Sequence, residues 1–227
     1  MKNTKNFFDQ FSVEYEGQSR YKYAFYRWIV DSICEEISKN GVIFDLGTGN
    51  GELALRLAHK FKKSKVCGVD ISRGMVVEAK KKAKKLNLKN VRFIVSPMEN
   101  LNKYSANFVV SNMAFHHVKN KKAVLEAIYS GLLPGGKVII GDYFKADLVD
   151  KKIVKNLQSK QHKRTILFKN SWKTMLSDMT KEYREKHPPE YLVSPTKLEK
   201  LISLAGFKKH KVLYCPLEDF AIVIGVK

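Results

Sequence analysis

The chain has 227 residues, of which 44% are hydrophobic, and this length suits a single globular domain with a full core. Its 42 Lys and Arg face only 22 Asp and Glu, and the resulting net charge of +20 fits either a solvated lysine-rich surface or attraction to a polyanion or an acidic substrate. No run of apolar residues is long enough to span a membrane, and the first ten residues lack the apolar core of a signal peptide. The three cysteines have no metal-type spacing, so we expect a cytoplasmic protein without a metal site or disulfides.

Aromatic and aliphatic side chains at helical spacing predict a first helix over residues 21–38. Apolar and amphipathic segments then alternate along the chain. Strands are predicted near 42–46, 65–70, 91–95, 107–112 and 137–141, and helices near 51–61, 73–87 and 121–132. Such alternation is typical of an α/β fold with a parallel sheet and helices on both faces.

Residues 147–187 interrupt this alternation with a helical stretch, and residues 151–187 hold 11 Lys and Arg against three acids. A final helix is predicted near 195–205, with Gly206 as its carboxyl cap. Apolar segments at 207–214 and 220–226 close the chain.

The strand predicted at 42–46 ends in Asp45 and breaks into a turn with glycine at positions 47, 49 and 51. Glycines let a ligand lie against the backbone, although they also serve plain tight turns. The next strand ends in Asp70, about 20 residues after the turn, where nucleotide-binding folds place an acid for the ribose hydroxyls. Together these two strand ends predict a nucleotide-type site.

Four segments in this order resemble the class I S-adenosylmethionine-dependent methyltransferases, specifically their type 11/12 small-molecule group. They are DLGTGNG at 45–51, VDIS at 69–72, FVVSNMAFHHV at 108–118 and LLPGGKVII at 132–140. An NAD-binding Rossmann enzyme is the competing interpretation, but its loop would read G-x-G-x-x-G, and the last glycine is missing here. The resemblance implies a Rossmann-like, seven-stranded, mostly parallel sheet with an antiparallel last strand.

The same resemblance divides the single domain into four parts and assigns a cofactor. Residues 1–40 would form a helical cover, 42–141 the cofactor-binding core, 147–187 a substrate lid, and 195–227 the closing helix and strands. The cofactor would be S-adenosylmethionine, with S-adenosylhomocysteine as product. The residues implied to hold it are Asp45, Gly47, Thr48, Gly49, Asp70, Ile71, Met98, Glu99, Ser111 and Asn112.

Three details of this assignment differ in their support. Asp45 is similar to the family acid that helps hold the methionine ammonium group, and Asp70 would receive the ribose hydroxyls. Pro97 stands where the family has an acid for the adenine amino group, so Ser96, Glu99 or a backbone carbonyl would have to replace it. The adenine contacts are therefore the weakest part of the analogy.

Methyl transfer requires alignment of the acceptor and, where the acceptor carries a proton, a base with a pKa near neutral. His116 and His117 follow the fourth strand and are candidate catalytic residues, although histidine here also braces loops. Adjacent residues do not easily both point inward. Tyr15 and Tyr21 are candidates to cover the acceptor, and Lys163 and Arg164 to bind an anionic group on it.

We expect a small-molecule acceptor, with an RNA or protein methyltransferase as the alternative that the basic charge supports. The fourth-strand segment reads Ser-Asn-Met-Ala, which lacks the Pro-Pro-aromatic pattern used on adenine amines and the Pro-Cys pattern used on cytosine. Nucleic acid is therefore a less favoured partner, and no membrane partner is expected. A cofactor-binding protein without catalysis is the third interpretation. The acceptor atom and the oligomeric state do not follow from the sequence.

Overall fold

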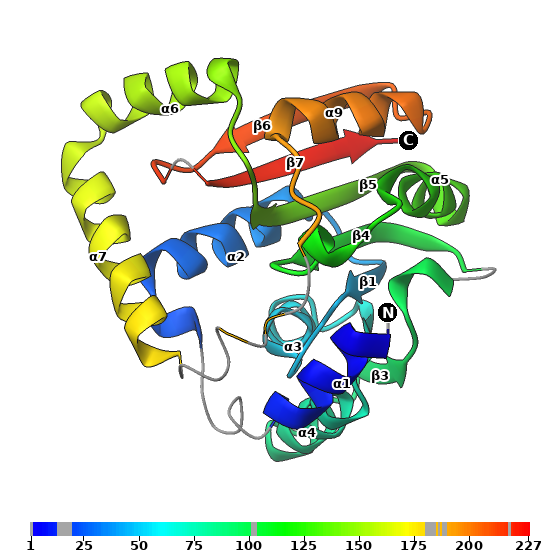
Figure 1. Cartoon of the computed structure of the whole chain (residues 1–227). Coiled ribbons are helices and arrows are strands. Elements are labelled where there is room, and N and C mark those ends of the chain that lie inside the picture. The colour runs from blue at the N-terminus through cyan, green and yellow to red at the C-terminus, as the bar shows by residue number, and fades with distance from the viewer. Residues whose placement is uncertain are drawn as a thin grey trace.

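One twisted sheet organises the part of the chain that the computed structural model describes, which comprises residues 2–12, 20–100, 104–179, 185, 187, 190–217 and 219–227. The strand order is β3-β2-β1-β4-β5-β7-β6 (Figure 1). The strands are Val42–Leu46 (β1), Lys65–Asp70 (β2), Val91–Val95 (β3), Ala106–Asn112 (β4), Leu132–Tyr143 (β5), Lys209–Tyr214 (β6) and Phe220–Val226 (β7). Strands β1 to β5 pair in parallel, and β7 runs antiparallel to both β5 and β6. The predicted Rossmann-like fold is confirmed.

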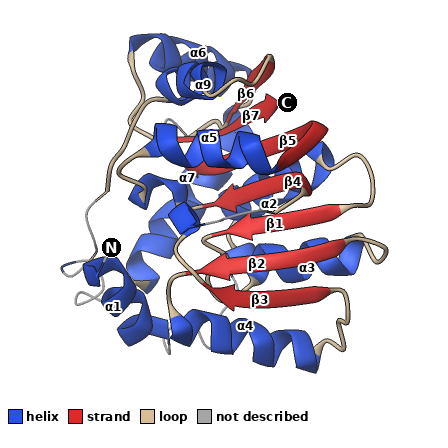
Figure 2. Ribbon diagram, turned by 90° about the vertical axis from the view of Figure 1, so that its right-hand side faces the viewer, coloured by secondary structure: helices blue, strands red, loops and turns tan. Residues whose placement is uncertain are grey.

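Helices cover both faces of the sheet, as Figure 2 shows. Apolar side chains of α2, α3, α4 and α7 form a buried cluster on one face, and those of α5 and α9 form another on the opposite face. The helices are Lys2–Gln10 (α1), Ala24–Glu36 (α2), Glu52–Lys60 (α3), Arg73–Lys85 (α4), Lys121–Gly131 (α5), Leu148–Lys160 (α6), His162–Asp178 (α7) and Pro195–Leu204 (α9). Short 3₁₀ turns occur at Arg20–Lys22 (η2), Met98–Asn100 (η3) and Phe115–His117 (η4). None of the helices within the described ranges is long and apolar enough to cross a membrane.

The predicted elements differ from the observed ones mainly at their ends. Strand β5 begins at Leu132, earlier than the predicted residue 137, because Leu132 pairs with Ala106 before the register shifts along the strand. Helix α2 is shorter than predicted, since Tyr23 has extended backbone angles and separates it from η2. Helix α9 ends with Ala205 as its cap residue, and Gly206, the predicted carboxyl cap, follows it with a positive φ of 107°.

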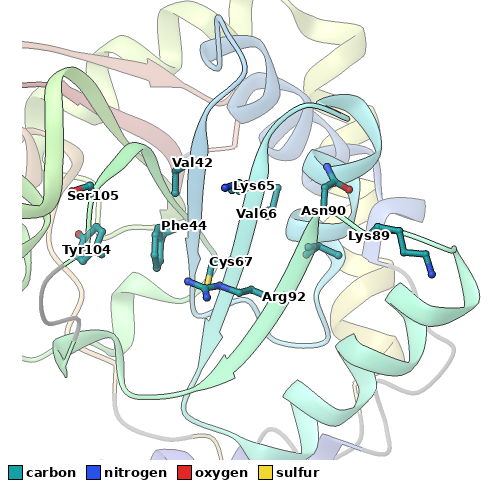
Figure 3. A pocket seen from close by; sticks show the side chains of 11 residues that line it. Val42, Phe44, Lys65, Val66, Cys67, Lys89, Asn90, Arg92, Tyr104 and Ser105 are labelled. Atoms are coloured by element: carbon teal, nitrogen blue, oxygen red, sulfur yellow. The ribbon is translucent and has the colours of Figure 1, made fainter.

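The connection from β3 to β4 contains η3 but no α-helix among its described residues. On the face that carries α5, the outer part of the sheet therefore borders a hollow of about 570 Å³ (Figure 3). Phe44, Cys67 and Tyr104 form its apolar floor, and Arg92 stands at its edge. Strand β3 buries only Phe93, whose side chain packs on the other face.

Gly141 on the central strand β5 is required by the close approach of helix α2. A Cβ atom at this position would lie 2.5 Å from Cγ2 of Ile29, a fully buried side chain. We expect Gly141→Ala to lower the free energy of unfolding by about 1–3 kcal/mol, because a packed core does not absorb an added methyl group. Urea denaturation would measure this change.

The matched control is the double variant Gly141→Ala/Ile29→Ala, in which the contact is relieved. Together the two substitutions should lower the free energy of unfolding by less than the sum of their single effects, because they act at one contact. Additive costs would show that Ile29 is not what excludes a side chain at position 141.

Candidate active site

The loop between β1 and α3 is folded back onto β2. The backbone N–H groups of Gly47 and Thr48 donate to the carbonyl of Val69 at 2.8 and 3.0 Å. Gly47 has a φ of 70°, and a Cβ there would lie 2.3 Å from Cβ of Ala114, so no other residue fits. Gly49 has a φ of 54°, but an added Cβ would meet nothing within 4 Å. The loop thus presents bare backbone at Gly49 to an open space.

Asp70, at the carboxyl end of β2, joins this loop to the start of α4. One carboxylate oxygen accepts the N–H of Gly49 at 2.7 Å, and the other accepts the N–H of Ser72 at 2.9 Å. The side chain is buried, and burial raises the pKa of Asp70 above its usual value. Each oxygen retains a lone pair, so the carboxylate still has the capacity to accept two hydrogen bonds from a ligand.

Asp45 lies beneath the glycine loop. It is 1% exposed, and its carboxylate accepts a hydrogen bond of 2.6 Å from the hydroxyl of Thr48. Burial raises the pKa of Asp45 to about 7. The carboxyl group therefore orders the loop from below and is not among the residues that line the adjoining cavity.

A cavity of about 750 Å³ opens at the carboxyl ends of the central strands. It is lined by most of the residues that the sequence predicts for the cofactor and by one of the two histidines. These predicted residues are Gly47, Thr48, Gly49, Asp70, Ile71, Met98, Glu99, Asn112 and His117. The structure thus brings together residues from the ends of β1, β2 and β4 and from the loop after β3.

Asn112 contributes a buried amide to this cavity. Neither its side-chain nitrogen nor its side-chain oxygen has a partner in hydrogen-bonding geometry among the described residues, and the hydroxyl of Tyr26 is the neighbouring polar group. Buried polar atoms are nearly always paired, so an amide without a partner at a cavity wall indicates a place for a polar ligand group. The open space at Gly49, the acceptor capacity of Asp70 and this amide together fit a nucleoside ligand that also carries polar groups beyond the sugar.

Several predicted residues lie elsewhere. Ser111 turns its hydroxyl to the carbonyl of Leu46 at 2.9 Å and ties β4 to β1 outside the cavity wall. Lys163 and Arg164 lie on α7, both exposed, and do not line the cavity. Tyr15 falls outside the described residues, as does the side chain of Tyr21.

The two adjacent histidines differ in environment. The ring nitrogen Nδ1 of His116 lies 2.7 Å from a carboxylate oxygen of Asp142, and its backbone N–H donates to the other oxygen at 2.8 Å. Burial lowers the pKa of His116, but the charge of Asp142 outweighs it, so the pKa is raised. His117 instead lines the cavity, with its ring 5.6 Å from that of Phe8 and 5.2 Å from that of His187.

Tyr191, in the segment before α9, is held against this loop by both of its backbone groups. Its N–H donates to the carbonyl of His116 at 2.8 Å, and its carbonyl accepts from Nζ of Lys121 at 2.6 Å. Burial lowers the pKa of Lys121 to about 8. These bonds fix Tyr191 as part of the cavity wall.

Helix α1 forms the cover of the cavity, with Thr4 and Phe8 in the lining. Its Asp9 accepts hydrogen bonds from the hydroxyl of Ser72 at 2.7 Å and the N–H of Gly74 at 3.0 Å. These contacts attach α1 to the first turn of α4, where an acid suits the helix dipole.

Several lining residues have no signal in the local sequence pattern. They are Arg20, Tyr26, Glu52, Lys119 and Tyr191, whereas Met113 lies in the segment 108–118 that resembles the family. Met113 has a positive φ of 55°, a backbone conformation that costs energy for a residue other than glycine and often occurs at functional sites. Among the described residues, no group of three or more His, Cys, Asp and Glu side chains is placed to hold a metal ion.

Comparison with known proteins identifies relatives of this chain. A family model described as "Methyltransferase domain" matches residues 37–190. The chain is 34% identical over 102 residues to the release factor glutamine methyltransferase of Buchnera aphidicola, a match that covers 44% of this chain and 37% of that protein. It is 29% identical over 116 residues to the ubiquinone/menaquinone biosynthesis C-methyltransferase of Wigglesworthia glossinidia brevipalpis, covering 49% and 46%. The chain thus spans less than half the length of these two relatives.

A solved structure agrees with the fold over nearly its whole length. The magnesium protoporphyrin IX methyltransferase of Synechocystis PCC 6803, with bound S-adenosylhomocysteine, superposes with a TM-score of 0.63. The match covers 98% of this chain and 97% of that one at 15% identity, so it shows the fold alone.

The raised pKa of Asp45 has a consequence for stability. Since this pKa is about 7 in the folded protein and near 3.8 in the unfolded chain, the folded state holds the proton more tightly. The stabilisation that this proton gives the folded state is complete below the pKa of Asp45 in the unfolded chain. It is lost as the pH rises through about 7, the pKa of Asp45 in the folded protein. Between pH 5 and pH 8, the wild-type protein without ligand should lose roughly 2 kcal/mol relative to Asp45→Asn, whose amide does not titrate. Urea denaturation at both pH values would measure the difference.

Thr48→Val is the companion control, because it removes the hydroxyl contact and leaves the carboxyl group to titrate. It should lose at least as much stability between pH 5 and pH 8 as the wild-type protein, because the hydrogen bond from Thr48 lowers the pKa of Asp45. An Asp45→Asn variant with the same slope as the wild-type protein would contradict the raised pKa.

Proposed function

The chain belongs to the class I S-adenosylmethionine-dependent methyltransferases, and on this premise we propose that it transfers the methyl group of S-adenosylmethionine to a small-molecule acceptor. The observation that carries the proposal is the cavity at the strand ends, where Gly49, Asp70 and Asn112 offer groups that match a nucleoside linked to an amino acid. The bound cofactor would supply a methyl group already attached to its own leaving group. The protein has to bind the cofactor and the acceptor, align them and exclude water.

The cofactor residues have distinct proposed tasks. Asp70 accepts the two ribose hydroxyls with the lone pairs that Gly49 and Ser72 leave free. Ile71 and Met98 flank the adenine as apolar walls, and both line the cavity. The Asn112 amide pairs with polar groups of the methionine part. The contact of Asp45 with the ammonium group stays a prediction, since its carboxylate lies beneath the loop.

We assign the acceptor side to His117 and its neighbours. His117 lines the cavity and takes the proton of an acceptor that must lose one, whereas His116 positions the loop through its bonds to Asp142 and Tyr191. Phe8 of α1 and Tyr191 cover the site and keep water from the reacting atoms.

The relatives support a small acceptor more than a macromolecular one. Three of them are named as ubiquinone/menaquinone biosynthesis C-methyltransferases, although the release factor enzyme acts on a protein by its name. For an anionic group on the acceptor, Lys119 is the candidate partner in a cavity lining that also holds Arg20, Glu52 and Glu99. That Lys163 and Arg164 of the proposed lid contact the acceptor stays a prediction.

Methyl-labelled S-adenosylmethionine incubated with the protein and a cell extract tests the activity and the acceptor class together. Label should enter the small-metabolite fraction, because the cavity of about 750 Å³ is the size of a small-molecule site. Separation by size followed by mass spectrometry would identify the product. An Asp70→Ala variant serves as the control that should transfer no label. Label in RNA or protein would instead establish the alternative, a methyltransferase acting through the basic surface.

The labelled acceptor then allows the role of His117 to be measured. We expect His117→Gln to lower kcat by about 10²-fold or more and to remove the pH dependence of the rate near neutrality, since glutamine accepts no proton. Affinity for S-adenosylhomocysteine, measured by calorimetry, should stay within about twofold of the wild-type value. A variant with unchanged kcat and an unchanged pH profile would show that His117 only braces the cavity.

A further inference from the structure

The hollow over β1, β2 and β3 lies where the described chain has no crossover helix. Helices α3, α4 and α5 connect β1 to β2, β2 to β3 and β4 to β5, whereas only η3 is described between β3 and β4. This connection has to cross β2 and β1 to reach β4, and it does so on the α5 face, where Met98 and Tyr104 pack into the buried cluster. In Figure 2 no described α-helix lies in front of β1 and β2. A layer of the fold is therefore incomplete on this face.

The register of the sheet shows which side chains form the hollow. Phe44 of β1 pairs with Cys67 of β2, and Cys67 pairs with Arg92 of β3. Paired residues of parallel strands point to the same face, so these three side chains form one row across the sheet. Phe44 and Cys67 are buried at the bottom, and the half-buried Val42 and Tyr104 stand beside them. Figure 3 shows this arrangement, in which the sheet itself supplies an apolar floor.

The rim of the hollow carries cations and no acid. Its eleven lining residues include Lys65, Lys89 and Arg92, which are all exposed, but no Asp or Glu. None of these three cations pairs with a carboxylate among the described residues. By contrast, Lys81 of α4 pairs with Glu78 at 2.6 Å. The apolar floor is thus bordered by positive charge that the described part of the chain leaves uncompensated.

The spacing of the rim cations matches one turn of a helix. Lys65 and Arg92 lie on neighbouring strands, two register positions apart, which separates their Cα atoms by on the order of 8 Å. Acidic residues at positions i and i+4 of a helix lie about 6 Å apart along its axis. The long side chains of lysine and arginine make up this difference. A helix that lies in the hollow can therefore present acids to both cations at once.

We propose that the hollow is the docking site for an acidic amphipathic helix of a partner protein. This helix takes the place of the missing crossover helix. Its apolar side would pack on Val42 and Tyr104, while its acidic residues pair with Lys65, Lys89 and Arg92. The hollow shares no lining residue with the cavity at the carboxyl ends of the strands, so the partner would bind outside the candidate active site.

Three other occupants fit the hollow less well. A second copy of the chain would bring a net charge of +20 to a positive rim. A strand of another chain would need a sheet edge for its hydrogen bonds, whereas the hollow presents a sheet face. Single-stranded nucleic acid would stack its bases on exposed aromatic rings, but Phe44 is only 6% exposed and its ring packs against that of Tyr104 at 4.8 Å.

A designed peptide tests the proposal with the full-length protein. The probe is a fluorescein-labelled helical peptide about five turns long, with Leu along one side and Glu on both flanks. It should bind the protein in fluorescence anisotropy, and the same peptide with Lys in place of Glu should not. Lys65→Gln/Arg92→Gln should weaken binding about tenfold or more and reduce its dependence on salt, because two of the rim cations are lost.

A second variant tests the hollow itself at constant charge. Ser105 is exposed in the lining, and Ser105→Trp would fill the hollow with an indole ring. This variant should also bind the peptide about tenfold or more weakly, because the apolar floor is covered. Circular dichroism and thermal denaturation would verify that each variant is folded. No step of the test requires cofactor or methyl transfer, so its outcome is independent of the proposed activity.

Matched controls separate the hollow from the general positive charge. Lys84→Gln/Lys85→Gln removes two exposed lysines of α4, and Ser203→Trp adds an indole at an exposed position of α9. Both should bind the peptide like the wild-type protein. Absence of peptide binding, or equal binding by Ser105→Trp and the wild-type protein, would overturn the proposal. A dimer in sedimentation, or a complex with an RNA oligonucleotide, that Ser105→Trp dissociates would assign the hollow to that occupant instead.

Discussion

The geometry of the site depends on one buried carboxylate, that of Asp70. Its two oxygens hold the backbone of Gly49 and of Ser72, so a single side chain sets the spacing between the loop after β1 and the first turn of α4. Ser72 in turn donates its hydroxyl to Asp9, which attaches α1 over the cavity. Two loops and the cover are thus positioned by consecutive hydrogen bonds that start at one acid.

Burial of these polar groups lowers the stability of the ligand-free protein, and a bound ligand would restore part of that stability. Burial raises the pKa of both Asp70 and Asp45, which means that the fold holds two carboxyl groups where water solvates them poorly. The amide of Asn112 adds buried polar atoms without partners among the described residues. Hydroxyl groups of a nucleoside would satisfy Asp70, and polar groups beyond the sugar would satisfy the amide of Asn112, whereas Asp45 stays beneath the loop and pairs with Thr48. The polar groups that cost stability are therefore the ones that give the cavity its affinity.

The two walls of the cavity differ in how far they follow from the sequence. The cofactor wall is local, since Gly47 and Asp70 belong to short strand–loop segments whose residue types match their backbone requirements. The acceptor wall is built by long-range contacts, such as the bonds from His116 and Lys121 to Tyr191. No local pattern marks a residue whose position is set by its backbone bonds to a distant loop. The placement of Tyr191 was therefore not predicted, whereas that of Gly49, which belongs to a local strand–loop segment, was.

The basic residues are a second case in which the sequence shows the residue types but not the direction in which they face. The position after β5 predicts that cations of the helical stretch contact the acceptor. In the structure Trp172 packs on Phe25, and Lys163 is exposed and outside the cavity lining. Net charge alone does not distinguish a solvated lysine surface from a binding surface. On α4, Val77 is the one exposed large apolar side chain, and Lys81 is paired with Glu78. On α7, by contrast, the aliphatic pair is adjacent and lies between lysines without an acid. The charge of +20 therefore acquires a meaning only where the structure shows which groups stand beside the cations.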